Sequence, residues 1–267
     1  MRVTHQKTVP AKVRVEARRK AELTHGSCSL VDQALVAIGR WIVDGRYTPG
    51  QTLPTEHEIC RELGIGRNAI REAIKMLVSK GLVRTVRRLG MIVKPRAEWN
   101  MLDPALLSWT LANPEIRETL LEDLASLRQI IEPEVAALAA ERASTVDNLR
   151  IYEAFEDMEA HGNDFELAVE ADIVFHKRLF DGAHHQLLSS IVPAFALLLR
   201  SDLEIAFHTG NFIAGLEHHR RVMEAIHRRD SEEARAQMRL LVQKNVKDLG
   251  GVSARRHRPR RVARRRK

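Results

Sequence analysis

Apolar residues recur at helical spacing in the first part of the chain, between clear turn signals. Residues 30–42 keep this spacing, and the Asp-Gly pair at 44–45 ends it. A second, short helix is expected to begin after Thr55, because Thr55 and Glu58 have the spacing of a capping box. The pattern therefore predicts two helices joined by a turn-rich segment.

A third helix is expected over residues 67–80, because apolar residues recur on one face at i, i+4 and i+7. These residues are Ile70, Ile74 and Leu77. Two β-prone runs follow at 82–86 and 91–93, with a basic hairpin tip at 87–90 between them. Helix, helix, tight turn, helix and a two-stranded ribbon is the plan of a winged helix-turn-helix.

The rest of the chain shows helical spacing and no strand signals. Helices are expected at 104–112, 115–131, 133–143, 146–161, 164–181, 185–208, 212–229 and 231–248. Proline and glycine residues mark the expected breaks, among them Pro133. Ser144 and Asp147 form a second capping-box pattern. The predicted fold class is mainly α: an N-terminal winged helix-turn-helix followed by a C-terminal all-α antiparallel helix bundle.

These signals divide the chain into five parts. They are a flexible basic arm (1–27), a winged helix-turn-helix domain (28–95), a linker (96–103), an all-helical domain (104–250) and a disordered basic tail (251–267). Aromatic residues make up only 4% of the chain, which argues against a β-sandwich or barrel and against RNA-stacking modules.

Charge is unevenly distributed, although the chain as a whole carries a net charge of +8. Basic residues exceed acidic ones by six over 25–96, whereas acidic residues are in excess by 12 over 97–252. Both ends are basic, at +5 for 1–24 and +9 for 253–267. A basic N-terminal third joined to an acidic remainder suggests that only one part binds a polyanion.

The sequence gives no sign of secretion or of a membrane span. Cys28 and Cys60 show no pairing typical of a disulfide framework or a zinc site. No apolar run approaches the roughly 20 residues that cross a bilayer, and the basic N-terminus lacks a following apolar segment. We therefore expect a cytoplasmic protein without a membrane partner.

The third predicted helix carries polar and basic residues opposite its apolar stripe. Arg67, Asn68 and Arg71 occupy its first turns, which a recognition helix presents to base edges in the major groove. Lys75 and the hairpin residues Arg87 and Arg88 are placed for phosphates or the minor groove. The alternative is that these charges merely solvate an amphipathic helix. Double-stranded DNA is the expected partner.

This region resembles the GntR family of transcription regulators. The resemblance rests on residues 53–56, 63–74, 81–82, Leu77 and Gly90. It implies that Arg67, Arg71 and the tip from Arg88 to Gly90 contact operator DNA. Many members have an arginine at the position of His57 and a serine at that of Gly66. The expected DNA-binding residues are Thr55, His57, Arg67, Asn68, Arg71, Lys75, Arg87, Arg88 and Gly90.

Three side chains of the helical domain are candidate metal ligands. Asp172 and His176 are spaced i, i+4, which places a carboxylate and an imidazole on one helix face, and His219 follows on a later helix. Such a set suits a divalent first-row metal ion, for which Zn, Ni and Mn are the candidates. The alternative is an ordinary pair on a helix face, with His218 as a spare candidate ligand.

Residues 172–179 and 219–226 resemble the all-helical FCD effector domain of FadR-type GntR regulators. The resemblance implies that Asp172, His176 and His219 bind a metal ion which in turn ligates a carboxylate effector. Many such domains supply a third histidine, at the position of Leu241 here.

Two arginines are candidate effector contacts. Residues 127–133 also match the family pattern, in which Arg128 reaches the effector carboxylate; an ion pair with Glu132 is the alternative. Arg200 lies in an apolar helix and is a second candidate, with an ion pair inside the bundle as the competing interpretation.

The segment from Glu98 to Trp109 resembles members of the family that respond to sugar acids, and an aldonate or related effector is therefore expected. Together these features predict a homodimeric repressor, not an enzyme, which a carboxylate releases from a palindromic operator. Two alternatives remain from other classes. One is a metal-dependent enzyme that uses the Asp/His site, and the other is a nucleic-acid compaction protein driven by the basic tails.

Overall fold

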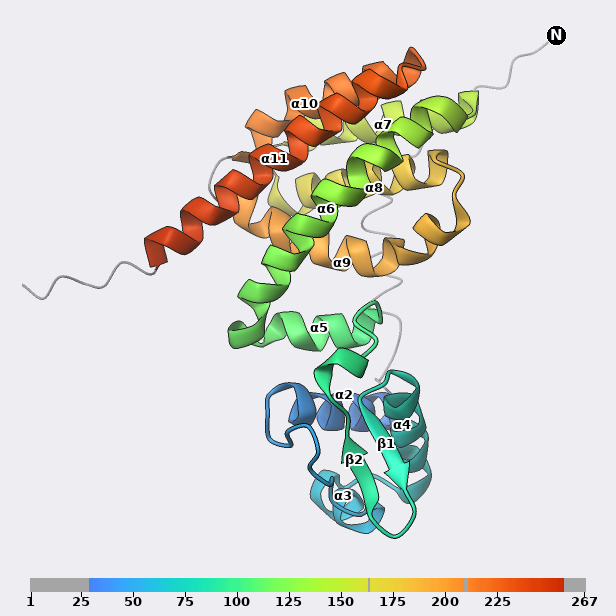
Figure 1. The fold of residues 1–267 in the computed structure, drawn as a ribbon, viewed down its shortest axis with the longest axis vertical. Helices are drawn as coiled ribbons and strands as arrows, with labels where there is room; N and C mark the ends of the chain where they lie inside the picture. The colour runs from blue at the N-terminus through green and yellow to red at the C-terminus, as the bar shows by residue number, and fades with distance from the viewer. Residues whose placement is uncertain (1–28, 163, 209–210, 257–267) are drawn as a thin grey trace, which may run out of the picture. The chain divides into compact units, whose positions relative to one another are not determined.

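The computed structural model describes residues 29–162, 164–208 and 211–256 (Figure 1). The expected basic arm (1–27) and residues 257–267 of the expected tail lie outside this part of the chain. The chain separates into two compact units at the junction of Asn113 and Pro114. Each unit is described by itself below.

The N-terminal unit is a winged helix-turn-helix with one further helix. Its elements are α2 (Leu30–Val43), α3 (Glu56–Leu63), α4 (Arg67–Ser79), β1 (Val83–Val86), β2 (Gly90–Val93), the 3₁₀ helix η1 (Arg96–Glu98) and α5 (Pro104–Ala112). The largest fully buried side chains of its core are Ile38, Ile59, Ile70, Leu77, Leu82, Leu106 and Leu107. The predicted helix and strand order of the winged domain is confirmed.

Local sequence signals set the geometry of the helix-turn-helix. Thr55 caps α3: its hydroxyl accepts from the Glu58 backbone N–H, and the Glu58 carboxylate accepts from the Thr55 backbone N–H at 2.8 Å. Gly64 then ends α3 in the left-handed region at φ 67°, where a side chain would be strained. These two signals place the start of α4 three residues later.

The wing is a two-stranded antiparallel ribbon. β1 pairs with β2 in the register from Val83↔Val93 to Val86↔Gly90, and Thr52 forms an isolated bridge to Ile92. The inward side chains Val83, Met91 and Val93 are buried. The ribbon is thereby fixed to the helices on one face, while its tip at 87–89 is exposed.

The expected linker and the first expected helix of the helical domain belong to the N-terminal unit. Lys80 Nζ lies 2.7 Å from Asp103 Oδ2, and both groups are largely buried. Trp109 packs so closely on α2 that a Cβ at Gly39 would lie 2.3 Å from its ring. The unit boundary therefore falls at 113/114, ten residues after the expected start of the helical domain at 104.

The C-terminal unit is an all-α bundle, in agreement with the predicted fold class. Its helices are α6 (Pro114–Arg142), α7 (Thr145–His161), α8 (Phe165–Gly182), α9 (Gln186–His208), α10 (Asn211–His227) and α11 (Ser231–Arg256). Figure 1 shows α6 and α11 side by side along much of their length, and α7 packs on α8. Helix α11 runs to Arg256 and so extends into the segment 251–267 that was expected to be a basic tail.

Pro133 does not separate two helices, and the expected break there is wrong. Helix α6 runs through Pro133 without a break and is 29 residues long in all. Proline removes the hydrogen bond to the carbonyl four residues earlier and costs about 3 kcal/mol in a helix interior. The buried residues that follow it, among them Val135, Ala136 and Ala139, outweigh this cost by packing in the bundle.

Polar side chains close the end of the bundle where α6 meets α7. The Ser144–Asp147 capping box begins α7 as predicted, and His184 Nε2 lies 2.9 Å from the same Asp147 carboxylate. Arg229 donates to the backbone oxygens of Glu141 and Ala143 and so satisfies carbonyls at the end of α6.

Within the described residues, no helix is both long and apolar enough to cross a lipid bilayer.

Candidate DNA-contact surface and metal-ligand cluster

Helix α4 has one buried and one exposed face, as its sequence predicts. Ile70, Ala73, Ile74 and Leu77 are buried, whereas Arg67, Asn68, Arg71 and Lys75 are exposed. Gly66 precedes the helix as its N-cap without a side-chain hydrogen bond. The first turns of α4 are thus open to a partner, in the position that a recognition helix uses for base edges.

Two of the exposed cations are held by neighbouring carboxylates. Arg71 Nε lies 2.8 Å from Glu56 Oε2 on α3, and Lys75 Nζ lies 2.8 Å from Glu72 Oε1. All four side chains are more than two-fifths exposed, and such pairs in high dielectric are weak. A phosphate or a base edge can therefore replace Glu56 at Arg71 at little cost.

The remaining predicted DNA contacts lie around α4. Arg87 and Arg88 are exposed at the wing tip, where Arg88 has φ 67° and Gly90 φ 86°. His57 is exposed on α3, while the Thr55 hydroxyl is used by the helix cap. The predicted set is thus accessible apart from the hydroxyl of Thr55.

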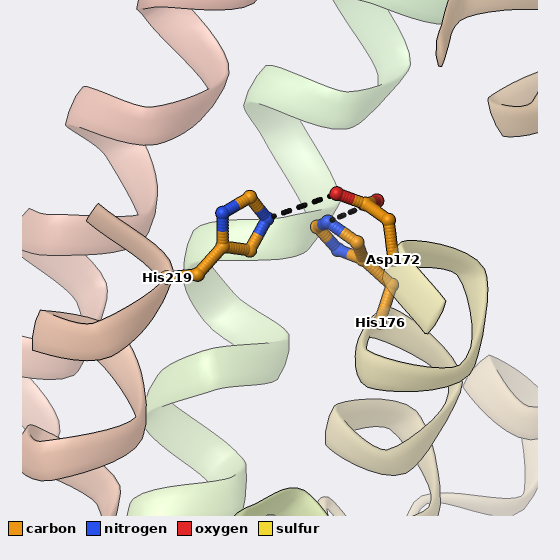
Figure 2. Close-up of side chains that lie close together, drawn as sticks. All are labelled: Asp172, His176 and His219. Carbon is orange, nitrogen blue, oxygen red and sulfur yellow. Dashed lines mark ion pairs between the residues drawn. The ribbon is translucent and has the colours of Figure 1, made fainter. Parts of the chain in front are cut away.

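The three candidate metal ligands come together in the bundle. Asp172 and His176 from α8 point toward His219 from α10 (Figure 2), and all three are buried. His176 Nε2 lies 3.4 Å from Asp172 Oδ1, and His219 Nε2 lies 3.3 Å from Asp172 Oδ2. One ligand atom of each residue lies within 4.8 Å of the others.

This cluster fits a divalent metal ion. Bonds of about 2.0–2.2 Å place neighbouring ligand atoms about 3.0–3.5 Å apart, and each imidazole lies at such a distance from one oxygen of Asp172. Asp172 Oδ1, His176 Nε2 and His219 Nε2 have no hydrogen-bond partner among the described residues. Buried polar atoms without partners are costly, and a divalent cation held by these three atoms would satisfy them. When bound, such an ion supplies Lewis acidity toward an oxygen ligand.

The orientation of His219 supports the same interpretation. Its Nδ1 donates to the backbone oxygen of Gly215 at 3.0 Å, which fixes the ring so that Nε2 faces Asp172. A Cβ placed on Gly215 would lie 3.8 Å from the His219 ring and 4.0 Å from Leu241. Leu241 is fully buried and borders the cluster on α11, where the family resemblance implies a third histidine.

Glu132 is a site residue that sequence reasoning considered only as an ion-pair partner. Its Oε1 lies 2.5 Å from Arg128 Nε, and its Oε2 lies 2.9 Å from His176 Nδ1. Burial alone would raise the pKa of Glu132, but Arg128 and His176 outweigh it and lower the pKa to about 2. The i, i+4 spacing to Arg128 was visible, whereas the contact from α6 to α8 has no sequence signal.

The pKa of His176, which lies between the carboxylates of Glu132 and Asp172, is also shifted. Burial alone would lower the pKa of His176, but Glu132 and Asp172 together raise it. The pKa of Asp172 is lowered, because His176 and His219 outweigh the opposing effect of its burial. The structure thus joins Arg128, Glu132 and the three candidate ligands in one buried network.

Arg200 lies in a different setting. Its guanidinium is 2.6 Å from Glu170 Oε2 and 3.8 Å from Glu166 Oε2, both on α8, and it is 37% exposed. The ion-pair interpretation of Arg200 is therefore present in the structure, and its contact with an effector stays a prediction. Arg128 likewise forms the ion pair with Glu132 that was its alternative.

A winged helix-turn-helix joined to a helical unit with a buried polar cluster defines a ligand-sensing DNA-binding protein. Comparison with family models makes this specific: residues 30–93 match the gntR family of bacterial regulatory proteins, and residues 123–244 match the FCD domain. The chain belongs to the GntR family and carries an FCD domain. It is a transcription regulator, and the alternative of a metal-dependent enzyme is not supported.

Individual relatives agree with this assignment. The galactonate operon transcriptional repressor of Escherichia coli K12 is 34% identical over 205 residues, which cover 76% of this chain and 89% of the relative. The putative L-lactate dehydrogenase operon regulatory protein of the same organism is 28% identical over 218 residues, covering 78% and 82%. Among solved structures, Lar of Listeria monocytogenes shares the fold, with a TM-score of 0.58 at 17% identity over 84% of this chain and 98% of that one.

Proposed function

We propose that this regulator is a homodimeric repressor of a sugar-acid catabolic operon, which a 2-hydroxy carboxylate such as an aldonate releases from its operator. The observation that carries the proposal is the buried cluster of Asp172, His176 and His219, with the guanidinium of Arg128 joined to it through Glu132. Acting on bacterial DNA, the protein would work in the cytoplasm.

The chemistry of the cluster suits a carboxylate ligand. A divalent ion, for which Zn, Ni and Mn are the candidates, would be held by one carboxylate and two imidazoles, which leaves coordination positions for another oxygen donor. Arg128 would direct the effector carboxylate through charge and a planar pair of donors. Leu241 contributes no ligand, so the effector itself can fill the position that a third histidine would take.

The relatives favour a hydroxy acid as the effector. One is named for the galactonate operon and another for the L-lactate dehydrogenase operon. Galactonate and lactate share a carboxylate with a hydroxyl group on the neighbouring carbon. These two oxygens can bind one metal ion together, which a simple carboxylic acid cannot do in the same way.

DNA binding is proposed to use α4 and the wing. Base edges would be read by Arg67, Asn68 and Arg71. Phosphates or the minor groove would be contacted by Lys75, Arg87 and Arg88. His57 would lie at the edge of this contact surface. A two-fold dimer would place two such units on a palindromic site. Effector binding in the helical unit would lower DNA affinity by favouring a second dimer geometry.

A thermal-shift screen tests the effector and the metal together. The full chain is heated with galactonate, gluconate or lactate, with Zn²⁺ or with a chelator, and galactitol and propionate serve as controls without the carboxylate or the 2-hydroxyl. A ligand at 100 times its Kd stabilises the folded state by about 2.7 kcal/mol. We expect a rise in Tm for the hydroxy acids that the chelator removes and that Asp172→Asn lacks.

Asp181 on the same helix provides the matched control: it is half-buried and pairs with Lys177 and Arg178, so Asp181→Asn leaves the cluster intact. Equal shifts for galactonate and galactitol, or shifts that the chelator leaves unchanged, would contradict the proposed site.

A further inference from the structure

We propose that Glu132 is a positioning residue for the metal-ligand cluster: its carboxylate holds His176 by Nδ1 and directs Nε2 toward Asp172 and His219. The proposal deepens the proposed function and rests on it for the metal, while the orientation of His176 can be measured without one.

The two histidines of the cluster present the same ring nitrogen to Asp172. Nε2 of His176 lies 3.4 Å from one carboxylate oxygen, and Nε2 of His219 lies 3.3 Å from the other. A histidine binds a metal through a nitrogen that carries no hydrogen, and an acceptor at the other nitrogen favours the neutral tautomer with its hydrogen on that other nitrogen. For His219 that acceptor is the backbone oxygen of Gly215.

For His176 the acceptor comes from another helix. Glu132 Oε2 on α6 lies 2.9 Å from His176 Nδ1, close enough for strong attraction although the two groups are not aligned as a hydrogen bond. Both side chains are about 1–2% exposed, so solvent does not screen the contact. Glu132 therefore faces His176 Nδ1 as an ion-pair partner, on the same ring nitrogen that the Gly215 carbonyl holds by a hydrogen bond in His219.

Only a carboxylate presents an acceptor oxygen to both neighbours of this position. Glu132 Oε1 accepts from Arg128 Nε at 2.5 Å while Oε2 faces His176. An amide has one acceptor oxygen, and its NH₂ group would face one of these two donors. Glu132 thus contacts Arg128 and His176 through different carboxylate oxygens. It thereby connects the proposed effector contact to the metal-ligand cluster.

A purely structural ion pair with Arg128 is the competing explanation, and a pair of double variants separates the two. Arg128→Met with Glu132→Gln, and Arg128→Met with Glu132→Leu, both remove the buried cation along with the buried anion. Glutamine keeps one oxygen that can accept from His176 Nδ1, whereas leucine, of similar size, keeps none. Glu141→Gln, an exposed change on the same helix, is the surface control.

The first readout is the affinity for Zn²⁺ alone, measured by competition with a chromophoric chelator on the full chain. Loss of the partner that orients a ligating histidine costs about 10- to 100-fold in metal affinity. We expect the variant with leucine to bind Zn²⁺ more weakly than the variant with glutamine by a factor in this range, and Glu141→Gln to match the parent chain.

The second readout is the ¹⁵N shift of the His176 ring nitrogens, assigned by comparison with His176→Gln. Nδ1 should carry hydrogen in the parent chain and in the variant with glutamine, and lose this preference in the variant with leucine. If the parent chain binds no Zn²⁺, the metal of the proposed function is refuted, and the ring-nitrogen shifts still decide the role of Glu132.

Equal Zn²⁺ affinities and equal His176 shifts in the two double variants would overturn the proposal. So would a parent chain in which His176 Nδ1 carries no hydrogen, a result that needs no variant to fold.

Discussion

Arg71 of the recognition helix is paired with Glu56 of the preceding helix, with 2.8 Å between Nε and Oε2. Both side chains are exposed, so the ion pair keeps the guanidinium at the surface but is weak. The sequence motif places both residues in the helix-turn-helix, but only the structure shows that they touch. If Arg71 contacts DNA as proposed, the DNA would displace Glu56.

Arg71→Ala is expected to lower affinity for a DNA site selected from genomic fragments by roughly 5- to 150-fold, the loss typical of one arginine that reads a base. Fluorescence anisotropy over a series of salt concentrations measures this. Arg239→Ala removes an exposed arginine on α11 and should leave the affinity unchanged. Equal losses in the two variants would show that α4 has no special role.

Arg128 should be far more important for stability than Arg200. Arg128→Met leaves Glu132 ionised and buried with one partner fewer, and breaking a buried pair typically costs 3–5 kcal/mol. Arg200→Met breaks a pair that is about one-third exposed and should cost less than about 1 kcal/mol. Urea denaturation followed by circular dichroism compares the two variants. Similar losses would mean that the Arg128 pair is as well solvated as the Arg200 pair.

Short-range signals explain what could be predicted from the sequence. The capping boxes at Thr55 and Ser144 involve residues three apart, and Asp172 and His176 share a helix face through their spacing. His219 was a candidate third ligand by residue type alone, and the family resemblance strengthened its pairing with this face, since nothing in the spacing determines which helices meet.

Long-range packing explains what the sequence did not reveal. Pro133 reads as a helix end by its local chemistry, and only burial in the bundle keeps α6 continuous. The approach of Trp109 to Gly39, 70 positions earlier, moves α5 into the N-terminal unit. Glu132 became a site residue for the same reason, because its contact with His176 joins two helices.

Stability should depend on pH through Asp147. Hydrogen bonding from the Ser144 hydroxyl, partly opposed by burial and supported by the Ser144 backbone N–H and His184, lowers the pKa of Asp147. A lowered pKa in the folded state means that the stabilisation is complete above the unfolded value of about 3.9 and is lost as pH falls through the folded value.

Asp147→Asn should therefore destabilise the chain by about 1 kcal/mol at pH 7, the usual value of a helix cap, and by progressively less below pH 4. Urea denaturation at several pH values measures the difference from the parent chain. Asp157→Asn changes an exposed residue of the same helix and should show no such trend. A difference that stays constant down to pH 3 would contradict the assignment.

Gly39 should be intolerant of any side chain. A Cβ at this position would lie 2.3–2.7 Å from three atoms of the Trp109 ring, so Gly39→Ala forces a shift that costs about 1–3 kcal/mol. Gly66→Ser is the matched change at an open glycine, and it should stabilise α4 by a few tenths of a kcal/mol as an N-cap. Thermal unfolding of both variants measures the contrast, and a neutral Gly39→Ala would show that Trp109 moves freely.

Release of DNA by a hydroxy acid is the most direct test of the proposed regulation. Anisotropy of a selected DNA site is followed with Zn²⁺ present while galactonate is added to the parent chain, to Asp172→Asn and to Asp181→Asn. We expect release from the parent chain and from Asp181→Asn, and continued binding by Asp172→Asn. Undiminished DNA binding by the parent chain across galactonate, gluconate and lactate would contradict the proposed regulation, as would equal release from Asp172→Asn.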